Sequence, residues 1–121
     1  MYKINFYRDK NGKEPVAEYI TELSKKKDKD SRIKLNKILD YINVLKEHGK
    51  SAGVPYIKHI EDEIWELRPL RDRIFFVAWN GDSFILLHHF MKKTQQTPKR
   101  EIEQAKREYK DLIERSTKYD E

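Results

Sequence analysis

The sequence contains no cysteine. Disulfide bonds, thiolate chemistry and cysteine-based zinc sites are therefore excluded, and this composition fits the reducing cytoplasm. No segment approaches the roughly 18 apolar residues that a transmembrane helix needs. The first residues, "MYKINFYRDK", lack the apolar core of a signal peptide. We therefore expect a cytoplasmic protein that is neither exported nor inserted in a membrane.

Several enzyme signatures are also missing. The sequence has no P-loop, no dinucleotide-binding fingerprint, no G-x-S-x-G and no H-E-x-x-H, so the chemistries that these motifs carry find no support. His88 and His89 are adjacent in an expected strand, where neighbouring side chains point to opposite faces. They cannot readily hold one metal ion together, and we expect neither a metal site nor a cofactor.

What is present is a densely charged chain with enough aromatic side chains to fold. Its 121 residues are 39% charged and 37% hydrophobic, with seven Tyr, five Phe and two Trp. This length suits a single domain, residues 1–121, and the aromatic content argues against disorder. The formal net charge of +5 favours an acidic partner such as nucleic acid, an acidic protein or a membrane surface, although basic proteins often bind no anion specifically.

The first half of the chain predicts one strand and a helical hairpin. "YKINFYR" alternates with the period of a half-buried strand. Pro15 suits the first position of a helix, and a second, longer helix follows the charged run "SKKKDKDSR" and ends at Gly49. The apolar positions recur at helical spacing in both helices; they are Val16, Tyr19, Ile20 and Leu23 in the first and Ile33, Leu35, Ile38, Leu39, Ile42 and Leu45 in the second.

The second half predicts a three-stranded antiparallel meander and a closing helix. The strands are "EIWELRPL", "DRIFFVAW" and "SFILLHHF", and "NGD" between the last two suits a tight hairpin turn. Thr97 and Pro98 can open a final amphipathic helix. The expected class is α+β, with the meander in one sheet, helices over one sheet face and the other face open for function.

Cations are expected to gather at one end of this sheet. Alternation places Glu66 and Arg68 on the same strand face, and Arg68 and Arg73 flank the connection "PLRD". Lys92 and Lys93 return to the same level at the end of the last strand. Such a patch suits an anionic ligand, most simply a phosphate. The alternative is structural: Arg68 pairs with Glu66 or Asp72, and the lysines are ordinary solvated surface.

The stretch "IWELRPLRDRIFFVAWNGDSFILLHHFMKKTQQTPKREIEQAKREY" resembles the HigB-like toxins of the RelE/ParE superfamily, in the phage-derived branch. The resemblance covers residues 54–115 and includes the KKTQ-x-TP segment after the last strand. It implies a RelE-like fold and the toxin of a bacterial type II toxin–antitoxin pair. The implied activity is metal-independent, ribosome-dependent cleavage of messenger RNA. The implied partners are the ribosome-bound message and a HigA-like helix-turn-helix antitoxin that carries operator DNA, with no membrane partner.

The resemblance also suggests roles for the patch. Arg73 is the expected phosphate clamp, with Arg68 and Lys93 beside it and Glu66 as general base. The expected RNA-binding residues are Lys58, His59, His89, Lys92 and Gln95, among which His59, His89 or a lysine protonates the leaving oxygen. Two other interpretations stay open: a ParE-like protein that inhibits DNA gyrase by binding without cutting RNA, and an inactive DNA-binding accessory bound to an antitoxin.

Overall fold

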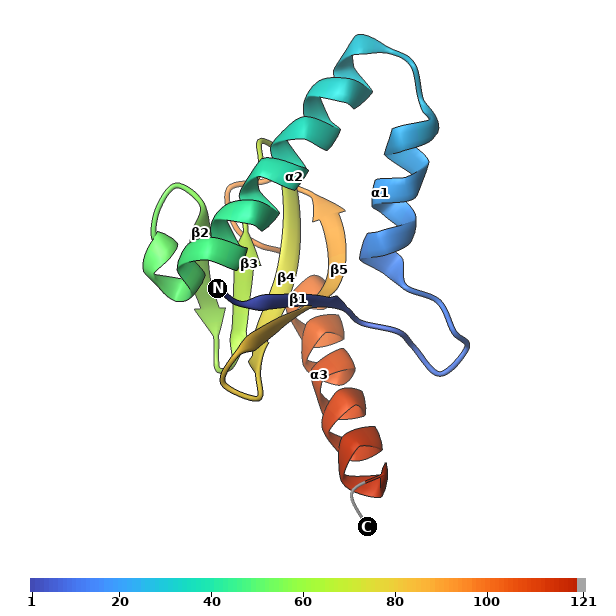
Figure 1. Ribbon diagram of the computed structural model, residues 1–121, viewed down its shortest axis with the longest axis vertical. Helices are drawn as coiled ribbons and strands as arrows, with labels where there is room; N and C mark the ends of the chain where they lie inside the picture. The colour runs from blue at the N-terminus through green and yellow to red at the C-terminus, as the bar shows by residue number, and fades with distance from the viewer. Residues whose placement is uncertain (120–121) are drawn as a thin grey trace.

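A computed structural model describes residues 1–119 of the chain as one five-stranded sheet with three α-helices (Figure 1). The strands lie in the order β1-β5-β4-β3-β2, in which β1 runs parallel to β5 and the other neighbours are antiparallel. The α+β class is confirmed. The elements are β1 (Lys3–Phe6), α1 (Pro15–Lys25), α2 (Lys29–His48), the 3-10 helix η1 (Gly49–Ala52), β2 (Ile57–Glu61), β3 (Ile64–Leu67), β4 (Asp72–Trp79), β5 (Ser83–Met91) and α3 (Lys99–Tyr119).

Both faces of the sheet carry helices, so the expectation of an open face was wrong. One apolar cluster joins the sheet to α1 and α2 through residues such as Val16 and Ile38. A second cluster on the other face includes Phe75 and the fully buried Ala105 of α3. The apolar stripe of α3 needs a surface to bury, and the second sheet face provides it.

Local signals placed several element ends correctly. Gly49 ends α2 with φ +59°, and its backbone N–H donates to the carbonyl of Leu45. Asn80 and Gly81 both have positive φ in the β4–β5 hairpin turn, as a tight primed turn requires. The cap at the start of α2 was not predicted: the Asp28 side chain accepts from the backbone N–H of Ser31 at 3.0 Å.

The strand β2 was not predicted. Its sequence, IKHIE, has only one fully buried residue, Ile57, and therefore lacks the regular apolar alternation of a half-buried strand. It forms the outer edge of the sheet, where it pairs Lys58 with Glu66 and His59 with Trp65. Within residues 1–119, no helix combines the length and apolar character that a membrane crossing demands.

Candidate active site

A buried carboxylate lies between two guanidinium groups on the sheet face that α3 covers. Glu66 on β3 is 2% exposed. Its Oε2 lies 3.5 Å from Nε of Arg68 and 3.9 Å from Nε of Arg73. Thr97, just before α3, directs its hydroxyl towards Oε1 of Glu66 at 3.4 Å. The predicted grouping of these three charged residues is therefore present, and the ion pair expected in the structural alternative is present with it.

Two backbone carbonyl groups fix the position of the Arg73 guanidinium. Nη1 donates to the carbonyl oxygens of Leu70 at 2.8 Å and Asp72 at 2.9 Å. Leu70 adopts φ +57° in the turn that offers its carbonyl. Burial lowers the pKa of the Arg73 guanidinium, which the Glu66 carboxylate opposes, but arginine stays protonated at neutral pH. Within residues 1–119, Nε and Nη2 of Arg73 have no hydrogen-bond partner.

Arg73 opens onto a cationic pocket of about 460 Å³, which we call the Arg73 pocket. The backbone N–H of Lys92 donates to the carbonyl of Arg71 at 2.8 Å, which fixes the segment after β5 against the β3–β4 turn. No acidic residue lines the pocket, so its chemistry suits an anion with several oxygens. Its lining consists of Leu70, Arg71, Arg73, Lys92, Lys93, Thr94 and Gln95.

Of the five expected RNA-binding residues, Lys92 and Gln95 line this pocket together with Lys93, and the other three do not. Lys58 is exposed beside Glu66, its partner across the β2–β3 pair. His59 bonds the carbonyl of Asp62 through Nε2 at 2.7 Å and packs against Trp65. Because cross-strand partners share a face, Trp65 places His59 on the α1–α2 face.

His89 also lies on the wrong face for a role in the Arg73 pocket. Its ring stacks on Tyr19 of α1, with centroids 3.5 Å apart. Burial lowers the pKa of the His89 imidazole, against the raising effect of Asp72. The neighbouring His88 points the other way, as predicted, and is buried against α3, where Nδ1 lies 2.5 Å from Oε1 of Glu108. His59 and His89 therefore lie on the sheet face opposite Arg73, and their RNA-binding role stays a prediction.

A second polar cluster, which the sequence analysis missed, supports the turn before Arg73. Asp72 is 1% exposed; its Oδ1 accepts from the Tyr19 hydroxyl at 2.9 Å and its Oδ2 lies 3.7 Å from Nζ of Lys34. Burial and the bond to Asp72 raise the pKa of the Tyr19 phenol. The only sequence signal was an aspartate at the start of a core strand, and its partners on α1 and α2 are far away in the chain. The cluster ties the helical hairpin to the residue next to Arg73.

Metal ligands are not gathered at the Arg73 pocket. Within the part of the chain that the structure describes, no three His, Cys, Asp or Glu side chains are arranged to hold a metal ion. The groups that can bind an anion here are the guanidinium and ammonium groups named above.

Comparison with known proteins identifies the family. A model of the family described as "Phage derived protein Gp49-like (DUF891)" matches residues 18–110, which is most of the chain. No curated protein matches the sequence. The matched region includes most of the helical hairpin, strands β2 to β5 and the Arg73 pocket. The chain therefore belongs to the Gp49-like phage-derived family, a toxin-like family of the RelE/ParE type.

Proposed function

We propose that the chain is a HigB-like toxin that cuts messenger RNA on the ribosome without a metal ion. In this proposal a HigA-like helix-turn-helix antitoxin neutralises it and carries the operator DNA. Membership of a toxin-like family supports the assignment as a toxin. The Arg73 pocket supports RNA cleavage over gyrase inhibition, because a protein that only binds gyrase does not need a phosphate clamp.

The observation that most strongly supports RNA cleavage is the fixed, partly unpaired guanidinium of Arg73. Two backbone carbonyls hold one end of the group, and the residue lines a pocket with Lys92 and Lys93. Negative charge grows on the non-bridging oxygens when a nucleophile attacks a phosphate. Preorganised cationic donors stabilise that charge without reorganising during the reaction. Such a pocket can supply the stabilisation that a metal ion supplies in other nucleases.

The proposed reaction is an internal transesterification. The ribose 2′-hydroxyl gives up its proton while its oxygen bonds to the adjacent phosphorus, and the bond from phosphorus to the 5′-oxygen breaks. That oxygen leaves with a proton from Lys92 or Lys93. The products are a 2′,3′-cyclic phosphate and a free 5′-hydroxyl, so all atoms are accounted for.

Glu66 accepts the 2′-hydroxyl proton in this proposal only if Arg68 moves. The Glu66 carboxylate is buried and does not line the Arg73 pocket. The Arg68 side chain is 25% exposed, so it can turn towards the substrate phosphate and uncover Oε2. In the resting arrangement Glu66 holds both guanidinium groups in place.

Induced expression in growing bacteria tests the proposal. Wild-type protein should stop growth and leave messages with new 5′ ends inside codons, and Arg73→Ala should do neither. Because Arg73 is 7% exposed, Arg73→Lys provides a second variant that keeps the charge but not the two-carbonyl anchor. Arg107→Ala is the matched control, since Arg107 is an exposed arginine on α3.

The alternative outcomes are distinct. DNA breaks and an SOS response with intact messages would favour the ParE-like gyrase inhibitor instead. Growth arrest by Arg73→Ala at wild-type protein levels would contradict the role of Arg73.

A further inference from the structure

The interface between β5 and α3 contains a buried polar cluster. His88 on β5 is 3% exposed, and its Nδ1 lies 2.5 Å from Oε1 of Glu108. A carboxylate accepts hydrogen bonds, so Nδ1–H of His88 is the donor. On the other side of the ring, Nε2 lies 3.5 Å from Oε1 of Glu101, in the first turn of α3, and has no hydrogen-bond partner within residues 1–119. We call His88, Glu101 and Glu108 the His88 cluster.

Stability alone does not explain the His88 cluster. The surrounding interface is apolar, since the fully buried Ala105 and the partly buried Ile102 of α3 pack there. The Phe75 ring meets the His88 ring edge-on, with centroids 5.4 Å apart. Moving charged groups out of water is costly, and apolar residues in place of a buried ion pair often leave a fold equally or more stable. The place of the cluster in the fold suggests what else it does.

The His88 cluster joins the two ends of a segment that lines the Arg73 pocket. This segment, residues 92–98, lies between the end of β5 and the start of α3. Four of its residues line the pocket, and its Thr97 directs the hydroxyl towards Oε1 of Glu66 at 3.4 Å. His88 lies near the end of β5 and Glu101 near the start of α3. Their contact therefore holds together the two elements from which the segment is suspended.

We propose, on the basis of the nuclease function above, that His88 is a positioning residue for RNA cleavage. It holds the start of α3 in a fixed place against β5, and the segment 92–98 then presents its lysines to the Arg73 pocket and Thr97 to Glu66. His88 itself is buried and touches no substrate. Displacing catalytic groups by about 1 Å can cost about a hundredfold in rate. The His88 cluster should therefore affect the rate of cleavage rather than the binding of the message.

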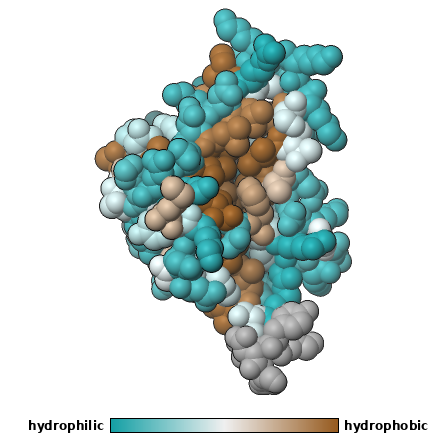
Figure 2. Space-filling model, viewed as in Figure 1, coloured by the Kyte–Doolittle hydropathy of each residue, from teal (hydrophilic) through white to brown (hydrophobic). Residues whose placement is uncertain are grey.

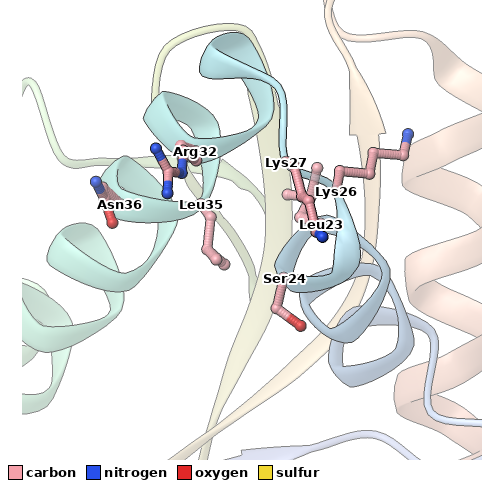
Figure 3. A pocket seen from close by; sticks show the side chains of 7 residues that line it. All are labelled: Leu23, Ser24, Lys26, Lys27, Arg32, Leu35 and Asn36. Carbon is pink, nitrogen blue, oxygen red and sulfur yellow. The ribbon is translucent and has the colours of Figure 1, made fainter.

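The helical hairpin on the opposite sheet face supplies a control for stability. Figure 2 shows apolar surface between α1 and α2, framed by hydrophilic side chains. At the upper end of this surface, a pocket of about 470 Å³ lies between the end of α1 and the start of α2 (Figure 3). Leu23 lines this pocket and is 4% exposed, and neither the segment 92–98 nor the His88 cluster contributes to the lining. Leu23→Ala should therefore lower stability without moving α3.

Single-turnover cleavage of a defined message engaged on ribosomes, by the full chain, tests the role of His88. The double change His88→Leu with Glu108→Leu replaces the buried ion pair by apolar side chains. At saturating ribosome complex its cleavage rate should fall at least about tenfold, while the concentration that gives half the maximal rate should change less than about twofold. In urea the double variant should unfold at a midpoint no lower than that of Leu23→Ala.

Single changes at His88 show whether its hydrogen bond restores the rate. His88→Asn places an amide N–H near the position of Nδ1 and can still donate to Glu108, whereas His88→Leu cannot. His88→Asn should cleave at close to the wild-type rate, and His88→Leu should be as slow as the double variant. His48→Asn makes the same change at an exposed histidine and should cleave like wild type. If His88 had only a structural role, the rates would follow the unfolding midpoints, and Leu23→Ala would be slow as well.

Three results would overturn the role of His88 and leave the nuclease function intact. One is a double variant that cleaves at the wild-type rate. Another is a Leu23→Ala protein that is as slow as the double variant, because lost stability would then explain both. The third is a raised half-saturating concentration with an unchanged maximal rate, because the cluster would then serve binding. No cut by the wild-type protein would overturn the nuclease function and the role of His88 together.

Discussion

Replacing Tyr19 by Phe tests whether the hairpin fastens the turn before Arg73. The change removes one hydroxyl, and the 2.9 Å bond to Asp72 with it, but keeps the ring that stacks on His89 at 3.5 Å. Asp72 is 1% exposed and its Oδ2 already lacks a hydrogen bond. The carboxylate would then keep only its ion pair with Lys34.

The expected loss of unfolding free energy is about 2 kcal/mol, the usual range for a hydrogen bond to a charged group being about 1.5–3 kcal/mol. For a chain of this length that corresponds to a fall in Tm of roughly 6–12 °C. Urea unfolding followed by tryptophan fluorescence measures it, with a lower midpoint and an unchanged m value expected.

Tyr56→Phe is the matched control for this measurement. Its ring lies 4.9 Å from that of Tyr41, and among the described residues its hydroxyl makes no hydrogen bond, so a change under about 0.5 kcal/mol is expected. A double-mutant cycle of Tyr19→Phe with Asp72→Asn should give a coupling energy of about 1 kcal/mol. If Tyr19→Phe unfolded at the wild-type midpoint, or if the coupling energy were zero, the Tyr19–Asp72 bond would not stabilise the fold.

Three further outcomes are expected. Lowering the pH through the ordinary pKa range of histidine should destabilise the wild-type fold, because the folded state binds the His89 proton less readily than the unfolded chain does. In His89→Phe, the urea midpoint of unfolding should therefore depend less on pH. Gly49→Ala should lower the free energy of unfolding by about 2–4 kcal/mol in urea, because the strain of a positive φ is joined by a clash between the new Cβ and the Tyr2 ring 2.6 Å away. Gly81→Ala has open space around it and should lower it by only about 1–2 kcal/mol, from the positive φ alone. Glu66→Gln should lower single-turnover cleavage, because the amide cannot accept the 2′-hydroxyl proton; unchanged cleavage would contradict the role of Glu66 as general base.

Local chemistry explains which parts of the fold were predictable. Backbone conformation and strand period are determined by a few neighbouring residues. They were enough to predict the helix end at Gly49, the Asn80–Gly81 turn and the shared face of Glu66 and Arg68. The placement of Lys92 beside the β3–β4 turn followed from antiparallel geometry.

The missed features depend on contacts between distant segments. The Tyr19–Asp72 bond joins residues 53 positions apart, and His88 meets Glu108 across 20 positions. Strand alternation predicted that His88 and His89 lie on opposite faces of the sheet. It did not predict which helix covers each face. The stacking of His89 on Tyr19 of α1, on the face opposite Arg73, therefore could not be foreseen.

Primer extension on a defined message engaged on ribosomes shows whether the protein cuts RNA there and whether the cut needs Arg73. Wild-type protein, Arg73→Ala and the control Arg107→Ala would be compared with and without EDTA. We expect a cut inside the decoding-site codon that persists in EDTA, is kept by Arg107→Ala and is lost in Arg73→Ala. No cut by a preparation that still stops growth, or a cut that Arg73→Ala retains or EDTA abolishes, would contradict it.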